Sequence, residues 1–476
     1  MTPRAGAFRK WQIPTALILL IAGLLNSCSS FSPPSLPSIP GITPPSEDDE
    51  AKISREFRRQ ARKNLKFTND PEVERYLDSV GRRILTVVGP QSFEYRYFVI
   101  DEPILNAFAV PGGSIFIYAG IISRVKSTDE LAAVMAHETT HVAKRHMARA
   151  SGLDPISILG MLGAVLAARS GAGAQAAATV GQGIALTRQI AYTRQLEMEA
   201  DTLGIKYMTE AGYDPKAMLS FQKIMLQEQA LNPIDFPPYL LDHPVTQDRI
   251  SNAEVVMRSM KSIEPKVMGA DPIKKIQTLL RLERNETDNV IAEQKKILAQ
   301  SVKNSEPYQL LGLAYLAKGM LPEARKNLEQ AMALNPQSPG IDRDLGRMYT
   351  EFKAFDSAHV AFDRALALDP KEALTYLYLG DLFEKEGDLR SAAGAYLNAG
   401  NFAPLWDKPP YRLGMVYGKL DRLGDAYYYL GRALLLQDED ERATVDFEKA
   451  IKAAGEDSPR GRVIKDELQA LKARRR

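Results

Sequence analysis

Residues 127–146 read STDELAAVMAHETTHVAKRH, and this stretch decides how the surrounding domain is built. Ser127 and Glu130 have the spacing of a capping box, in which the two side chains satisfy the first free N–H groups of a helix. Apolar residues follow at helical spacing, so the sequence predicts a helix that begins next to Ser127. On this helix His137 and His141 are four residues apart and share one face.

Two histidines one helical turn apart bring two imidazole nitrogens close enough to bind one metal ion, at about 2.0–2.1 Å each for zinc. Glu138 lies about 100° round the helix from His137, beside such an ion rather than on it. From there its carboxylate can take a proton from zinc-bound water and pass it to a leaving amine. The sequence therefore predicts one Zn²⁺ per chain, with His137 and His141 as ligands and Glu138 as the catalytic base.

The metzincin pattern would add a glycine and a third histidine after this motif, and the sequence has neither. His146 stands five residues past His141, which is about 140° away from the ligand face of a continued helix. We expect His146 at the surface or behind the ligands. The third ligand must come from another segment.

A second predicted helix, from about residue 184 to Ala211, offers that ligand in the run Glu197-Met198-Glu199-Ala200-Asp201. Glu197 and Asp201 are four residues apart and share a face. We expect Glu197 to bind the metal and Asp201 to accept a hydrogen bond from a ligand histidine. Glu199 points away from that face and is the alternative ligand.

The residues ahead of the motif predict a small sheet between helices. Residues 51–90 read as two helices, and the aromatic run Phe93–Ile100 reads as a strand. Leu105–Val110 and Ser114–Tyr118 form a strand pair around Pro111-Gly112-Gly113. The strand before or after the glycines can bind an extended peptide at its edge through backbone hydrogen bonds, and a plain hairpin is the alternative.

From residue 305 the sequence repeats every 34 residues. Leu-Gly pairs, an aromatic residue three positions later, alanines and prolines all keep this step, which is typical of tetratricopeptide repeats. The small residues let two helices approach closely, and proline ends the second helix. The sequence predicts four repeats over 305–440, a helical connector or degenerate repeat over 261–304, and a capping helix with a basic tail over 441–476.

The N-terminal residues 1–27 have the pattern of a signal peptide, with a basic start and an apolar run too short to span a bilayer. The run ends in Leu25-Asn26-Ser27-Cys28, which resembles the lipobox of bacterial lipoproteins. This resemblance implies that Cys28 is acylated and anchors the protein to the outer membrane. An uncleaved N-terminal anchor is the alternative. Residues 28–50, rich in serine and proline, predict an extended tether.

Composition excludes several classes of protein. The chain has 476 residues, 45% of them hydrophobic and 25% charged, as expected for a folded protein of several domains. Its 61 basic residues against 59 acidic ones leave no excess for binding nucleic acid. Cys28 is the only cysteine, which excludes an internal disulfide and a cysteine-based zinc site.

Several motifs occur in an order that resembles the gluzincin family of HtpX-type, Oma-type and CAAX prenyl endopeptidases. They are Asn106-Ala107-Phe108 with Pro111-Gly112-Gly113, His137–His141, Glu197-x-x-Ala200-Asp201, and His243-Pro244 through Arg249. The resemblance covers roughly 51–260 and implies a zincin-type α+β domain, mostly helical, ahead of the α-solenoid of repeats. It implies supporting or regulatory roles for Asp201, His243 and Arg249, and a substrate strand that includes Asn106, Pro111, Gly112 and Gly113.

His243 is the last histidine able to approach the metal. We expect it either to occupy the fourth metal position and hold the enzyme latent, or to hydrogen-bond the transition-state oxyanion. Capping of a loop is the structural alternative.

With the lipoprotein signal and the repeats added, the chain is similar to the periplasmic BepA-like proteases of Gram-negative bacteria. These degrade misassembled outer-membrane proteins and assist their assembly. The resemblance implies a lipid-anchored periplasmic zinc endopeptidase that acts on unfolded or misassembled proteins and uses its repeats to recruit substrates or assembly machinery. A chaperone or assembly scaffold with a latent or regulatory metal site is the alternative, and an aminopeptidase is a weaker third.

Overall fold

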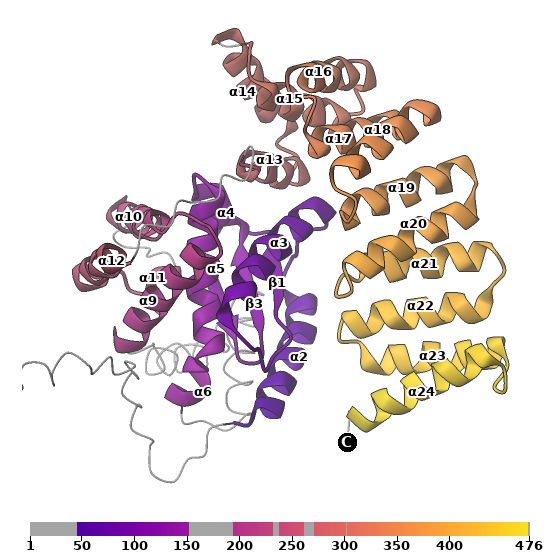
Figure 1. Ribbon diagram of the computed structural model, residues 1–476, viewed down its shortest axis with the longest axis horizontal. Coiled ribbons are helices and arrows are strands. Elements are labelled where there is room, and N and C mark those ends of the chain that lie inside the picture. The colour runs from indigo at the N-terminus through magenta and orange to yellow at the C-terminus, as the bar shows by residue number, and fades with distance from the viewer. Residues whose placement is uncertain (1–44, 152–193, 232–237, 261–270, 301, 475–476) are drawn as a thin grey trace, which may run out of the picture. The chain divides into compact units, whose positions relative to one another are not determined.

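The computed structural model describes residues 45–151, 194–231, 238–260, 271–300 and 302–474, all within one compact unit, Thr43–Arg476. The predicted signal peptide, Cys28, the tether up to residue 44 and the start of the helix predicted from about residue 184 lie outside the described residues. The described part is mostly helical with one small sheet, which confirms the predicted fold class (Figure 1). No helix in these ranges is both long and apolar enough to cross a bilayer.

The sheet has three strands, β1 (Arg96–Ile100), β2 (Ala107–Val110) and β3 (Ser114–Tyr118), in the order β1-β3-β2. β1 runs parallel to β3, and β2 runs antiparallel to it. β3 therefore lies in the middle, and β2, the strand before the two glycines, lies at an edge. Gly112 in the turn between β2 and β3 has a φ of 87°, and a Cβ there would lie 2.2 Å from the carbonyl oxygen of Glu50.

Helices cover both faces of the sheet. α2 (Glu47–Asn64) packs Ile53, Phe57 and Ala61 against one face. The other face packs against α3 (Pro71–Val88), α4 (Ala119–Arg124) and α5 (Thr128–Ala143), which share the largest hydrophobic core.

The prediction that the tether extends to residue 50 is wrong at its C-terminal boundary, because α2 begins at Glu47. Ser46 and Asp49 form a reciprocal capping box at its start. Four acidic residues fill the first turn, where they interact favourably with the helix dipole. The acidic run that reads as the end of a linker is therefore the first turn of a helix.

α5 begins as predicted, with the Ser127 hydroxyl accepting a hydrogen bond from the N–H of Glu130 at 3.2 Å. The Glu130 carboxylate accepts from the N–H of Lys126 instead of closing the box on Ser127. The helix ends at Ala143, and Arg145 adopts a left-handed φ of 53° before the short helix α6 (His146–Ser151). The chain thus turns back after α5, so the angular position expected for His146 on a continued helix is wrong.

α9 (Arg194–Glu210) packs directly on α5 and ends before Gly212, as predicted. A Cβ on Gly204 would lie 3.3 Å from the backbone nitrogen of His137, so glycine allows the two helices to approach closely. α10 (Lys216–Leu231), α11 (Pro238–Asp242) and α12 (Gln247–Ser259) follow.

The segment predicted as a connector contains α13 (Ile273–Glu283) and α14 (Thr287–Gln300). Ile273, Ile276 and Leu280 of α13 lie in the same hydrophobic core as α3 and α5. Half of the connector is therefore built into the core of the preceding domain, which its sequence pattern did not indicate.

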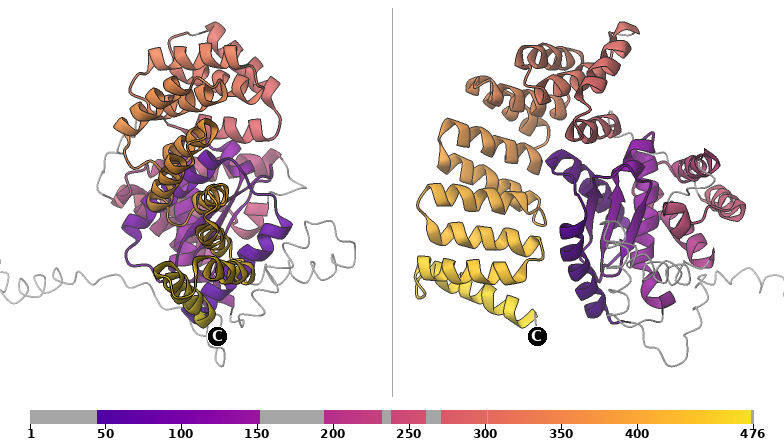
Figure 2. Two further views of the ribbon diagram at one scale, coloured as in Figure 1. Left: turned by 90° about the vertical axis from the view of Figure 1, so that its right-hand side faces the viewer. Right: turned by 180° about the vertical axis from the view of Figure 1, so that it is seen from behind.

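The repeats form four pairs of helices that stack along the array (Figure 2), and this confirms the prediction of a helical solenoid. The pairs are α15 (Ser305–Ala317) with α16 (Leu321–Leu334), α17 (Pro339–Glu351) with α18 (Phe355–Leu368), α19 (Ala373–Glu386) with α20 (Leu389–Phe402), and α21 (Lys408–Lys419) with α22 (Leu423–Leu436). A Cβ on the Leu-Gly glycine would lie 2.4–2.7 Å from a side chain of the second helix in every pair. That neighbour is a leucine or an aromatic residue sixteen positions later, for example Tyr396 over Gly380.

The prediction of one capping helix after residue 440 is wrong, because the chain forms two. α23 (Asp440–Ala454) and α24 (Pro459–Arg474) are separated by Gly455, which has a φ of 84°. Glycine accepts this left-handed conformation without strain and proline begins a helix readily, so the chain turns between the two.

A buried cluster of ion pairs joins α3, α13 and α17. The Nζ atom of Lys275 lies 2.7 Å from Glu72 and 2.8 Å from Asp344, and Arg343 also donates to Glu72. These four side chains are at most 9% exposed.

Candidate metal centre

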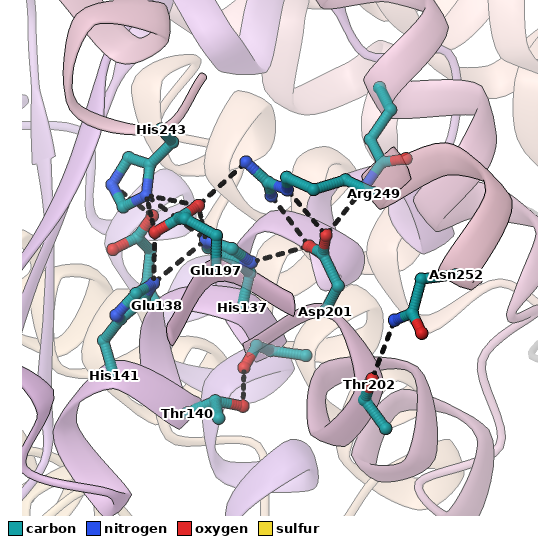
Figure 3. Close-up of polar contacts among 12 residues, drawn as sticks. His137, Glu138, Thr140, His141, Glu197, Asp201, Thr202, His243, Arg249 and Asn252 are labelled. Atoms are coloured by element: carbon teal, nitrogen blue, oxygen red, sulfur yellow. Dashed lines mark hydrogen bonds and ion pairs between the residues drawn. The ribbon is translucent and has the colours of Figure 1, made fainter. Parts of the chain in front are cut away.

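Three elements far apart in the sequence bring the predicted site residues together. α5 supplies His137 and His141, α9 supplies Glu197, and the segment after α11 supplies His243 (Figure 3). One ligand atom from each of these four side chains lies within 4.8 Å of the others. All four side chains are at most 2% exposed.

The distances between the ligand atoms fit a four-coordinate metal ion. Four donors at about 2.0–2.1 Å from one ion lie about 3.3–3.4 Å apart at the corners of a tetrahedron. The Nε2 atom of His137 lies 3.0 Å from Nε2 of His141, 3.4 Å from Glu197 and 3.3 Å from Nδ1 of His243. Glu197 lies 3.3 Å from Nε2 of His141 and 3.1 Å from Nδ1 of His243. The donor set of three imidazoles and one carboxylate suits zinc among the divalent metals.

Arg249 of α12 braces the carboxylates of α9. Its Nε and Nη2 atoms donate to the two oxygens of Asp201 at 2.7 and 2.8 Å, and Nη1 lies 2.8 Å from Oε2 of Glu197. Asp201 in turn lies 3.0 Å from Nδ1 of His137. A carboxylate in this position orients a ligand histidine, with Nε2 left to face the metal.

The charges around the site favour a bound cation. Burial opposes charge on His137, but the carboxylates of Glu197 and Asp201 raise its pKa to about 10. Burial also opposes charge on Glu197, but the neighbouring His243 and His137 hold its pKa well below the usual range. Burial lowers the pKa of His141 far below its ordinary value. Burial also opposes charge on His243, but the carboxylates of Glu197 and Glu138 raise its pKa. A metal ion that binds here must therefore displace a proton from His137.

Glu138 is fully buried, and its Oε1 lies 3.6 Å from Nε2 of His243.

The segment that carries His243 is held close to the sheet. The N–H of His243 donates to the carbonyl of Tyr239 at 2.7 Å, and the N–H of Tyr239 donates to the carbonyl of Leu105 at 3.2 Å. Leu105 lies just ahead of β2, so the His243 segment is hydrogen-bonded to the chain at the start of the edge strand.

The remaining predicted residues are not among the four side chains of the metal-ligand cluster. Asn106 is buried at the start of β2, and Pro111, Gly112 and Gly113 form the turn at the other end of that strand. Glu199, the alternative ligand, is absent from the metal-ligand cluster.

Sequence reasoning missed Tyr239, and of the two positions that it left open for His146 the structure shows the one behind the ligands. Tyr239 packs its ring against His243 at 4.8 Å between ring centroids, and no pattern in the sequence marked it. His146 is fully buried with its Nδ1 atom 3.0 Å from Nδ1 of His141.

Comparisons with known proteins agree with this arrangement. The model of peptidase family M48 matches residues 71–256, and a tetratricopeptide-repeat model matches residues 315–378. The beta-barrel assembly-enhancing protease of Escherichia coli strain K12 is 31% identical over 304 residues, which are 61% of this chain and 61% of that protein. The mitochondrial metalloendopeptidase OMA1 of Schizosaccharomyces pombe is 34% identical over 143 residues, which are 30% of this chain and 41% of that protein.

Among solved structures, MamA aligns with a TM-score of 0.31 and 23% identity over 34% of this chain and 95% of its own. The chain spans about 61% of the length of the first of these curated relatives. Residues 71–256, which hold the buried histidine and glutamate cluster, carry the match to peptidase family M48, and the segment that matches the tetratricopeptide-repeat model follows them in this chain.

Proposed function

We propose that this protein is a zinc-dependent endopeptidase of the periplasm that hydrolyses peptide bonds in misfolded or misassembled proteins, including those of the outer membrane. The observation that carries the proposal is the buried cluster of His137, His141 and Glu197 with Glu138 beside it. A zinc ion held there would supply a Lewis acid that polarises the scissile carbonyl and lowers the pKa of a water molecule. Glu138 accepts the proton of the attacking water and passes it to the leaving amine.

The edge position of β2 supports binding of an extended substrate. A polypeptide can add to this strand through backbone hydrogen bonds, which select little for sequence. In the structure the N–H of Tyr239 donates a hydrogen bond to the carbonyl of Leu105. This carbonyl lies next to the position that such a substrate would take. We infer that substrate and the His243 segment compete for this end of β2.

His243 supports a latent form of the enzyme. Structural zinc sites have four protein ligands, whereas catalytic sites keep the fourth position open. Nδ1 of His243 lies 3.1–3.3 Å from the nearest atoms of Glu197 and His137, as a fourth ligand would. Release of His243 would then open the position at which the substrate reacts.

Placement in the periplasm rests on the signal peptide over residues 1–27 and on acylation of Cys28, with residues 28–46 as the tether. The repeats are proposed to recruit substrates or the outer-membrane assembly machinery. A groove of about 1010 Å³, lined by both acidic and basic residues of the repeats and by the start of α3, supports this role. The name of the Escherichia coli relative, a beta-barrel assembly-enhancing protease, supports the class of substrate.

A second function is favoured by the closed four-ligand arrangement. In that case the protein is a chaperone or assembly scaffold whose metal site is latent or regulatory. The test is to incubate zinc-loaded protein, as wild type, E138Q and H243A, with an unfolded outer-membrane β-barrel protein. Cleavage within the substrate chain that E138Q abolishes supports the endopeptidase, whereas release of terminal residues would indicate an aminopeptidase. If no Glu138-dependent cleavage is seen even in H243A, the endopeptidase proposal fails and the scaffold function is the one that remains.

A further inference from the structure

We propose that His146 and Glu199 form a second line of support behind the metal ligand His141, as positioning residues that hold its ring with Nε2 toward the metal. This inference rests on the metal site of the proposed function. His146 and Glu199 lie next to the site but are not among the metal ligands, and the proposal gives both a positioning role.

The geometry forms a continuous line of polar groups. Nε2 of His141 lies in the ligand cluster, and its Nδ1 atom lies 3.0 Å from Nδ1 of His146. On the far side of the His146 ring, Nε2 lies 3.4 Å from Oε2 of Glu199. The His146 ring is fully buried and meets the His141 ring edge to face, with centroids 4.9 Å apart at 82°.

Proton counting on the two rings determines the direction of this line. A neutral imidazole carries one proton, and a ring that binds a metal through Nε2 carries it on Nδ1. Nδ1–H of His141 therefore donates to Nδ1 of His146, whose own proton must be on Nε2. The carboxylate of Glu199 lies 3.4 Å from that nitrogen, at ion-pair distance but without the geometry of a hydrogen bond. The line from carboxylate to histidine to histidine matches the shorter one from Asp201 to His137, so each ligand histidine of α5 has a support of its own.

The backbone at the end of α5 is what places His146 behind His141. The left-handed φ of 53° at Arg145 turns the chain back under the helix. The Arg145 guanidinium is held there by the Glu50 carboxylate at 2.5 Å and by the carbonyl of Pro45 at 2.5 Å. The turn is thus anchored to α2, which favours a defined position for His146.

The proposal is tested by zinc affinity, measured on the metal-free full-length protein by competition with a chromophoric chelator. The matched variants are H146L and H146N, because leucine and asparagine have the same shape but only the asparagine Oδ1 can accept the proton of His141. Loss of such a support typically weakens metal binding by about 10–100-fold. We expect a loss of this size in H146L, an affinity close to wild type in H146N, and an altered visible spectrum of Co²⁺ bound to H146L.

Melting temperatures of the metal-free variants separate folding from positioning, since only the metal affinity should divide H146L from H146N. If H146L does not fold, E199L and E199Q replace the pair, because Glu199 is 20% exposed and only glutamine keeps an acceptor there. Equal zinc affinity of H146L and wild type, or equal weakening by H146L and H146N, would overturn the proposal. Unchanged affinity in H141A would instead refute the metal site on which the proposal rests.

Discussion

Replacing Glu72 by glutamine should destabilise the folded protein by about 3 kcal/mol at neutral pH. Glu72 lies on α3 and accepts hydrogen bonds from Lys275 and Arg343 in the buried ion-pair cluster. Burial opposes its charge, but Arg343 and Lys275 outweigh burial and lower its pKa from 4.5 to about 2. Each unit of pKa difference between the unfolded and folded protein is worth about 1.4 kcal/mol, so the lowered pKa of Glu72 corresponds to about 3 kcal/mol of folding stability. The neutral glutamine cannot provide this stability.

The same pKa predicts how the effect depends on pH. The pKa of Glu72 is lower in the folded protein than in the unfolded chain, so its contribution is fully present above about pH 4.5. The contribution is lost as the pH falls toward about 2. The difference in stability between wild type and E72Q should therefore be largest near neutral pH and fall by about half near pH 3.3.

Urea unfolding followed by tryptophan fluorescence measures this difference. The chain has two tryptophans, and W11F leaves Trp406 as the single reporter. The Nε1–H of Trp406 donates to Glu74 of α3 at 3.0 Å, so its emission reports separation of the repeats from α3.

E351Q is the control, because Glu351 pairs with Lys385 at 2.6 Å with both side chains at least 41% exposed. Exposed pairs contribute little, so E351Q should change stability by less than about 1 kcal/mol. The reasoning fails if E72Q is as stable as E351Q at neutral pH, or if its deficit stays constant down to pH 3.3.

Three further predictions concern the metal site and the repeats. H243A should increase proteolysis by opening the fourth position, and unchanged proteolysis would exclude both the capping role and the oxyanion role of His243. Zinc binding near pH 7 should release a proton, because the pKa of His137 is raised to about 10 without metal. The zinc affinity should therefore rise with pH. Calorimetry in buffers of different ionisation enthalpy measures the proton release, and no release would contradict this prediction. G380A should lower stability by about 1–3 kcal/mol, because its Cβ would lie 2.4 Å from the Tyr396 ring. G394A, in the next helix with open space around it, should instead raise stability by up to about 1 kcal/mol, and equal melting temperatures of the two variants would contradict this packing.

Local spacing in the sequence was enough to predict the helices and their shared faces. Ser127 marks the start of α5, and a separation of four residues places His137 and His141 on one face of it. The step of 34 residues likewise predicted helix pairs, because each repeat encodes the same two helices. These features depend on neighbours within about one helical turn or on repetition, and both are visible in a single sequence.

The same reasoning failed where distant segments decide the outcome. The run Ser46–Glu50 reads as linker, yet it begins α2, and Gly455 divides one predicted capping helix into two. The segment that contains α13 was predicted as a connector or a degenerate repeat, and its apolar residues do not by themselves show which core they join. Only the packing of the whole chain assigns them to the core shared with α3 and α5.

The sequence by itself determined which residue types are available for the metal and which pairs share a helical face. Tertiary structure alone decided which of these groups meet. The close approach of α5 and α9 at Gly204 brings Glu197 to the two histidines, and the turn at Arg145 brings His146 behind His141. The hydrogen bond between Tyr239 and Leu105 holds the His243 segment against the start of the edge strand. The physical reason is that helical periodicity places side chains over one or two turns, whereas a metal site joins segments about 60 to 100 residues apart, and packing of the core sets those distances.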